Sequence, residues 1–235
     1  MPIADPLGGN KSSSAEDVQH IKAVATTERV RVALVEDDER VRQALVFELS
    51  TAGYAVTPYT CAEELLAAAD AGEFDCIVAD MCLPKMNGLQ LQEELNRTVP
   101  YASILFITGH GDLSLGMQAM RKGAVDFLEK PVDDQALLSS TTRGVQLSRR
   151  RRAEESQRIE LEERRRSLTF REHEVFDLIV IGLLNKQVGA QLGTTERTVK
   201  AHRARVMDKM GASSLADLVR MAGILENHAS MRTTR

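Results

Sequence analysis

Acidic side chains follow two apolar segments of the chain, at the points where buried strands would end. Glu36, Asp37 and Asp38 come directly after the run VALV, and Asp80 closes the run DCIVAD. If these strands are neighbours in a parallel sheet, the carboxylates share one pocket and repel each other unless a cation joins them. Hard oxygen ligands are typical of Mg²⁺ sites. The pattern therefore predicts a magnesium site, with Asp38 as a helix N-cap beside it; loop acids are the alternative.

Two further polar residues end other apolar segments, Thr108 in SILFIT and Lys130 in DFLEKP. A hydroxyl and an ammonium are groups that phosphoryl oxygens would need once Asp80 carries them. Taken singly, Thr108 could be an ordinary strand end and Lys130 a turn residue in a surface ion pair. Four polar residues that each end a different strand favour a phosphoryl-transfer pocket.

A parallel sheet is needed to bring these residues together, and the order of segments indicates one. Apolar strands are expected at 30–35, 55–60, 75–80, 103–108 and 126–131, with helices at 39–52, 62–71, 88–96, 112–122 and from about 133. Apolar runs without alternation indicate a sheet covered on both faces, and short βα repeats require right-handed crossovers. In such doubly wound sheets, ligands bind beyond the carboxyl ends of the strands.

Length and charge indicate two domains with different partners. A chain of 235 residues can form two hydrophobic cores. Residues 29–147 hold 18 acids and 10 bases, a net charge of −8, whereas residues 148–235 hold 12 acids and 18 bases, a net charge of +6. The basic half favours a polyanionic partner, although two solvated surfaces of opposite sign are the alternative.

The cysteines and the apolar segments indicate the compartment. Cys61, Cys76 and Cys82 are odd in number and lack C-x-x-C spacing, and the first residues show no apolar signal segment. No apolar stretch approaches the roughly 18 residues of a membrane span. We expect a reduced, cytoplasmic protein without a membrane partner.

The chain is expected to divide into four parts. Residues 1–28 are interpreted as a flexible extension, because they are rich in Gly and Ser. Residues 29–147 form the first domain, and residues 133–166 an extended helix and linker with opposite charges spaced i,i+4. A flexible tether is the alternative for this linker. Residues 167–235 form a domain of four helices.

Residues 185–210 carry the pattern of a helix-turn-helix. The segment NKQVGAQLG ends at a tight turn at Gly193, and a longer helix follows, capped by Thr194 or Thr195. Inward positions are Val188, Leu192, Val199, Val206 and Met210. Outward residues able to reach phosphates and base edges are Arg197, Thr198, Lys200, Arg203 and Arg205. A helical hairpin with an ordinary solvated face is the alternative.

The motifs VALVEDD, ADMCLPKMNG, FITGHGD and AVDFLEKP resemble the receiver domain of bacterial two-component response regulators, over about residues 30–147. The resemblance implies an α/β fold with a five-stranded parallel sheet of order 2-1-3-4-5. It implies that Asp80 accepts a phosphoryl group from a sensor histidine kinase, and that the Lys130–Pro131 peptide is cis. The implied Mg²⁺ ligands are Glu36, Asp37, Asp80 and the carbonyl of Cys82. Glu36 departs from the family, in which aspartate is commoner.

Switching is a further implication of this resemblance. The phosphoryl group would draw Thr108 inward and vacate space for Phe127, three residues before Lys130. The alternative for Phe127 is a fixed core ring.

The C-terminal segment resembles the LuxR-type DNA-binding domain through LTFREHEVF, the helix-turn-helix and SSLADLVRMA. The resemblance implies an all-α domain of four helices. Implied base or groove contacts are Thr198, Val199, Lys200 and Arg203, and implied phosphate contacts are Asn185, Lys186, Arg197 and His202. An implied dimer seam consists of Leu215, Leu218, Val219 and Ala222. Gly189, where alanine is usual, costs the helix about 1 kcal/mol, and Thr194 replaces a usual aliphatic residue.

Together the two parts resemble a NarL/FixJ-type response regulator, closest to the FixJ-like branch. The resemblance implies a transcription regulator, not an enzyme, in which phosphorylation of Asp80 promotes homodimerisation and binding to double-stranded promoter DNA. RNA polymerase is a further candidate partner. Two other functions stay open: a constitutive DNA-binding regulator with a vestigial receiver, and a hydrolase that uses an aspartyl-phosphate.

Overall fold

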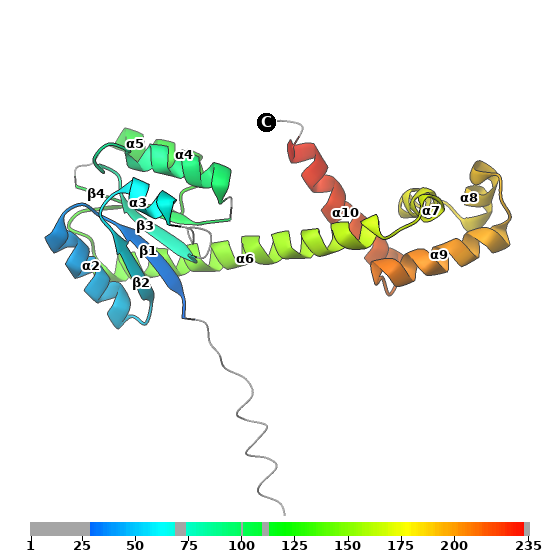
Figure 1. Cartoon of the computed structure of the whole chain (residues 1–235), viewed down its shortest axis with the longest axis horizontal. Helices are drawn as coiled ribbons and strands as arrows, with labels where there is room; N and C mark the ends of the chain where they lie inside the picture. Colours follow the sequence, from blue (N-terminus) through cyan, green and yellow to red (C-terminus); the bar gives the residue numbers. More distant parts are fainter. Residues whose placement is uncertain (1–28, 69–73, 100, 110–112, 233–235) are drawn as a thin grey trace, which may run out of the picture.

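The computed structural model describes residues 29–68, 74–99, 101–109 and 113–232, and Figure 1 shows two groups of elements at opposite ends of the long helix α6. The extension expected at residues 1–28 lies outside this range. The elements are, in chain order, β1 (Arg31–Val35), α2 (Glu39–Thr51), β2 (Ala55–Tyr59), α3 (Ala62–Ala67), β3 (Cys76–Asp80), α4 (Gly88–Thr98), β4 (Ile104–Thr108), α5 (Leu113–Arg121), β5 (Asp126–Glu129), α6 (Asp134–Arg166), α7 (Phe170–Val180), α8 (Asn185–Leu192), α9 (Glu196–Met210) and α10 (Leu215–Arg232).

The five strands form one parallel sheet in the order β2-β1-β3-β4-β5, which confirms the expected topology. Apolar residues of α3, α4 and α5 pack on one face of the sheet, and those of α2 and α6 on the other. Full coverage holds for β3 and β4 and nearly all of β1. The strands β2 and β5 are partly exposed because they form the two edges, so the expectation of coverage on both faces is wrong for them.

The helices and strands lie where they were expected, but several of their ends differ by one to four residues. β5 ends at Glu129, so Lys130 is the first residue after the strand rather than its last. α3 ends at Ala67, four residues before the expected end, and residues 69–73 lie outside the described part.

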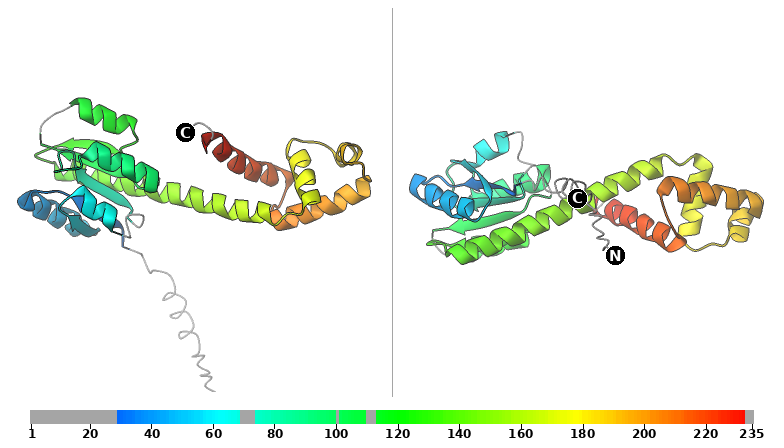
Figure 2. Two further views of the ribbon diagram at one scale, coloured as in Figure 1. Left: turned by 45° about the horizontal axis from the view of Figure 1, so that its top comes forward. Right: turned by 90° about the horizontal axis from the view of Figure 1, so that it is seen from below.

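α6 is one unbroken helix of 33 residues, as the linker pattern predicts. Asp133 caps it by accepting a hydrogen bond from the amide of Ala136. Both views of Figure 2 show α6 leaving the sheet and reaching the C-terminal helices. Where it lies on the sheet, its buried face carries small residues: a Cβ at Gly144 would lie 2.6 Å from Sγ of Cys76.

The helices α7 to α10 share a second core with the end of α6, which includes Phe176, Ile179 and Leu161. A capping box of Thr169 and Glu172 starts α7. Gly193 ends α8 in the left-handed conformation that glycine adopts easily, and Thr195 caps α9. Thr195, not Thr194, is therefore the cap.

In the part of the chain that the structure describes, no helix is both long and apolar enough to cross a membrane.

Candidate functional site

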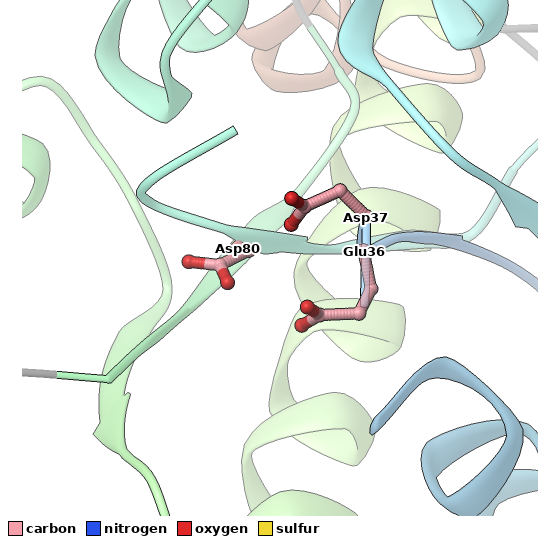
Figure 3. A group of neighbouring side chains, drawn as sticks. All are labelled: Glu36, Asp37 and Asp80. Carbon is pink, nitrogen blue, oxygen red and sulfur yellow. The ribbon is translucent and has the colours of Figure 1, made fainter. Parts of the chain in front are cut away.

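The carboxylates predicted to meet do share one pocket. β1 and β3 are adjacent, and Val35 lies opposite Ala79. The residues that follow these two, Glu36 and Asp80, therefore lie side by side. Oxygen atoms of Glu36, Asp37 and Asp80 all lie within 4.8 Å of one another, and Figure 3 shows the three groups turned to the same side. Glu36 and Asp80 are buried and Asp37 is exposed. The pocket can therefore offer hard oxygen ligands from two strands and remain open to solvent.

Lys130 points into this pocket from the end of β5. Its Nζ atom lies 2.7 Å from Oε2 of Glu36 and 2.6 Å from Oδ2 of Asp80. The peptide bond between Lys130 and Pro131 is cis, as expected. The alternative of a turn residue in a surface ion pair is therefore wrong.

Burial and charge act in opposite directions in the pocket. Burial raises the pKa of Glu36, although the hydrogen bond from Lys130 offsets part of this rise. Burial alone would lower the pKa of Lys130, but its hydrogen bonds to Asp80 and Glu36 outweigh that effect and raise it. Lys130 is therefore cationic at neutral pH. With all four groups ionised, three carboxylates and one ammonium carry a net charge of −2, which a divalent cation would neutralise.

The first turn of α2 holds the acidic loop in place. Asp38 caps α2, as predicted, by accepting hydrogen bonds from the amides of Arg40 and Val41, and these bonds lower its pKa. The guanidinium of Arg42 donates to the carbonyl oxygens of Glu36, at 2.8 Å, and Asp37, at 3.1 Å. Arg42 is not among the residues predicted from the sequence; its signal there is its place in the first turn of the helix that follows the acids.

Asp80 is positioned by a second hydrogen bond. The amide of Cys82 donates to its Oδ1 atom at 2.9 Å, while Oδ2 faces Lys130. The side chain of Cys82 is exposed and takes no part in this contact. The backbone after β3 therefore curls around the carboxylate.

Thr108 and Phe127 lie on the two strands beyond Asp80. Thr108 is the last residue of β4, is 1% exposed, and its carbonyl accepts a hydrogen bond from the amide of Lys130. Phe127 is half-buried, and its ring packs so closely on α5 that a Cβ at Gly116 would lie 2.9 Å from it. Thr108 therefore ends the strand next to that of Asp80, and Phe127 lies against α5.

The second candidate site is the outer face of α9 with the start of α8. Arg197, Thr198, Lys200 and Arg205 are exposed, and so is Lys186. Arg203 and His202 are half-buried, and Arg203 donates to Oδ1 of Asn185 at 3.2 Å. These positions leave the predicted contacts available, except for one residue. Val199 is fully buried in the C-terminal core, so a groove contact by its side chain is wrong.

The expected dimer seam on α10 needs a similar correction. Leu218 and Ala222 are buried in the core that α10 shares with α6 and α7, so they do not form a surface. Leu215 is partly buried against the same core, and Val219 is 42% exposed.

The turn between α8 and α9 explains why glycine stands at position 189, where alanine is usual. A Cβ at Gly189 would lie 2.9 Å from the carbonyl oxygen of Thr194.

Comparisons with known proteins agree with this geometry. Residues 32–142 match the family described as "Response regulator receiver domain", and residues 166–222 the family "Bacterial regulatory proteins, luxR family". "Transcriptional regulatory protein FixJ" of Azorhizobium caulinodans is 41% identical over 195 residues, which cover 83% of this chain and 92% of that protein. "Nodulation protein W" of Bradyrhizobium diazoefficiens is 42% identical over 200 residues, covering 84% and 88% of the two chains.

Solved structures give the same result. The response regulator StyR is 40% identical, with a TM-score of 0.73, over 82% of this chain and 98% of that one. Full-length FixJ from B. japonicum is 34% identical, with a TM-score of 0.51, over 83% and 97% of the two chains.

Proposed function

Because the chain belongs to the response regulators that join a receiver domain to a LuxR-type DNA-binding domain, and such proteins regulate transcription in response to phosphorylation, we propose that Asp80 is its phosphoacceptor. The observation that carries this proposal is the convergence of Lys130 and two further carboxylates on Asp80. We take residues 29–147 as the receiver, 133–166 as the linker and 167–235 as the DNA-binding domain.

In the proposed reaction, a carboxylate oxygen of Asp80 attacks the phosphorus of a phosphohistidine on a sensor kinase. A P–O bond forms, the P–N bond breaks, and the leaving imidazole takes up a proton. The ammonium of Lys130, already 2.6 Å from Asp80, then faces the phosphoryl oxygens and offsets their negative charge. Thr108 offers its hydroxyl from the end of β4.

Receiver domains bind Mg²⁺ at an acidic pocket, and this pocket has the donor set for it. The proposed ligands are Asp37, Asp80 and the Cys82 carbonyl, with Glu36 nearby and engaged by Lys130. When bound, Mg²⁺ would supply positive charge to the transferred phosphoryl group. Asp37 is the exposed acid of the three and is therefore the natural point of entry for a hydrated ion.

Phosphorylation is proposed to act through Thr108 and Phe127 on the surface formed by α5 and β5, and to promote a homodimer. Two C-terminal domains would then bind related half-sites of double-stranded promoter DNA. Proposed contacts are Thr198, Lys200 and Arg203 to bases, and Asn185, Lys186, Arg197 and His202 to phosphates. Val219 and Leu215 remain candidates for the seam on α10. The protein would meet these partners in the cytoplasm: the sensor kinase, promoter DNA and, as a further partner, RNA polymerase.

The test is phosphorylation of the intact chain by acetyl phosphate with Mg²⁺, followed by intact-mass analysis, sizing and DNA binding. We expect one added phosphoryl group on the parent, none on Asp80→Asn, and tighter DNA binding and a dimer in the parent alone. Asp133→Asn is the matched control, because asparagine also caps a helix and Asp133 lies outside the pocket.

The other two functions make different predictions. A vestigial receiver predicts the same DNA affinity for parent and Asp80→Asn with and without acetyl phosphate. A hydrolase predicts repeated turnover of phosphomonoesters instead of one slow, stoichiometric transfer. Either result would overturn the proposal.

A further inference from the structure

The helix α6 belongs to two hydrophobic cores, one near each end. Leu137 and Val145, in its first half, are buried against the sheet. Leu161, near its other end, is 4% exposed in the core of the C-terminal helices. The helix therefore connects the two domains as a structural member of both.

Two arginines fix the rotation of α6 about its own axis at the receiver. Nε of Arg149 lies 3.2 Å from Oδ1 of Asp75. Arg152 donates a hydrogen bond to the carbonyl of Phe74, and its guanidinium lies 5.1 Å from the centre of the Tyr101 ring. Because both side chains reach residues just before β3 and β4, at the amino-terminal ends of these strands, the helix cannot turn there without breaking these contacts.

A third arginine fixes α6 to α9. Nη1 of Arg164 donates to the carbonyl oxygen of Met210, the last residue of α9, at 2.9 Å. Gly211 follows, and a Cβ at that position would collide with the Arg164 guanidinium. Nζ of Lys209 donates to the carbonyl of Ser167, just beyond α6, at 2.9 Å. The C-terminal end of α9 is thus bonded to the end of α6.

The segment between the two sets of contacts has the features of a stiff rod. Arg152 and Leu161 are nine positions apart, which in a helix is about 13 Å. No Gly or Pro interrupts residues 145–166. Ion pairs along the helix link Arg150 to Glu154 and Arg158 to Glu155 and Glu162. Each such pair favours the helical form, and together the pairs oppose bending.

We propose that α6 couples the receiver to α9 as one rigid helix, so that its rotational phase decides whether phosphorylation brings α9 to DNA, with Arg164 as the positioning residue at the far end. The inference rests on the proposed function. In a receiver dimer, each α6 leaves its receiver in a fixed direction. Turning the C-terminal helices half a turn about that axis would point α9 away from the half-site.

Insertions between Ala153 and Glu154 test the phase directly. Since each helical residue adds about 100°, seven alanines turn the C-terminal helices by about −20° and nine by about 180°, at nearly equal length. Of the ion pairs named above, this site separates the exposed pair of Arg150 and Glu154. The DNA is a duplex selected from a randomised library by the parent chain treated with acetyl phosphate. The measured quantity is the ratio of Kd without acetyl phosphate to Kd with it.

We expect the insertion of seven residues to keep the ratio within about threefold of the parent, whose coupling should lie between about 5- and 150-fold. The insertion of nine should reduce the ratio to about one. Equal ratios in the two variants, whether kept or lost, would overturn the inference, because a flexible tether ignores phase. A parent ratio of one would instead contradict the proposed function.

Arg164 is tested with variants that keep its stem. Arg164→Met should lower the same ratio about threefold or more, and Arg164→Lys should restore part of it through one remaining hydrogen bond. Arg166→Met is the control, because that side chain is 79% exposed. If Arg164→Met weakens DNA binding equally with and without acetyl phosphate, the residue supports the fold alone and the positioning role is overturned.

Discussion

The ammonium group of Lys130 lies 2.6 Å from Oδ2 of Asp80, although 50 residues separate the two in the chain. The same ammonium lies 2.7 Å from Glu36, so one cation joins carboxylates from the ends of two strands. Positive charge is therefore in place at the proposed phosphoacceptor before a phosphoryl group arrives, and no rearrangement is needed to supply it.

Replacing this lysine tests its role in phosphoryl transfer. Lys130→Met should slow phosphorylation by acetyl phosphate by about 10²- to 10³-fold, because one preorganised charge at the reacting oxygens is lost. The rate is measured by intact-mass analysis over time. Lys122→Met is the matched control, since that ammonium pairs with Glu93 on the outer surface of the receiver. A parent-like rate in Lys130→Met would contradict the proposed reaction.

Magnesium should stabilise the receiver through Asp37. A ligand present at 100 times its Kd raises the free energy of unfolding by about 2.7 kcal/mol, so the Tm of the parent should rise with added Mg²⁺ and fall again with chelator. In Asp37→Asn most of this rise should disappear, while the stability without metal changes little because the side chain is exposed. Asp38→Asn, which keeps the cap, should respond like the parent. Thermal unfolding by circular dichroism measures both.

Glu172 should make the C-terminal domain sensitive to acid. The hydrogen bond from Lys209, at 2.7 Å, and that from the amide of Thr169 lower the pKa of this buried carboxyl to about 2 from an ordinary 4.5. Because the folded-state pKa is the lower one, the stabilisation is present above about pH 4.5 and is lost as the pH falls toward about 2.

The measurement is the free energy of unfolding against pH for the parent and Glu172→Gln, in which glutamine can still complete the capping box. The parent should lose more stability than the variant across the acid window. Parallel curves would show that this ion pair does not set the acid response.

Gly189 should resist replacement by alanine in spite of helix propensity. Alanine favours a helix interior by about 1 kcal/mol over glycine, but its Cβ would lie 2.9 Å from the backbone carbonyl of Thr194. We expect Gly189→Ala to lower the free energy of unfolding. Gly223→Ala in α10 meets no atom within 4 Å and should raise it by about 0.5–1 kcal/mol. Denaturant titration of both variants separates the steric effect from the propensity effect.

Lys186 should contribute electrostatically to DNA binding, as a proposed phosphate contact. Its side chain is exposed at the start of α8, so Lys186→Ala should weaken binding to all duplexes and reduce the slope of log K against log salt by about one. Arg220→Ala, on α10 and paired with Asp217, is the control with the same loss of charge. Equal slopes for Lys186→Ala and the parent would remove this residue from the interface.

The receiver pocket could be predicted from the sequence because each of its residues lies at the end of a strand or directly after one. Glu36, Asp80 and Lys130 follow apolar runs of obvious length, and parallel strands bring such ends together. The C-terminal side chains were predicted less well. Spacing correctly placed Val199 inward, whereas the family resemblance assigned it to the DNA groove. Substitutions on the surface of a domain can change its contacts with DNA without changing its fold.

The contacts that the sequence did not reveal are arginine bonds to backbone carbonyls. Arg42 bonds to the carbonyls of the acidic loop, and Arg164 to that of Met210. Every residue has a backbone carbonyl, so the residue type does not show which carbonyl will accept a hydrogen bond from an arginine. Which of the many arginines finds one depends on how two elements approach in space.

The close contact of Gly144 with Cys76 turns a buried sulfur into a gauge of helix opening. Burial raises the pKa of the Cys76 thiol to about 12, so at neutral pH it is protonated and unreactive. An alkylating reagent can reach it only while α6 is lifted from the sheet. The rate at which this thiol is modified therefore reports how often α6 separates from the sheet of the receiver.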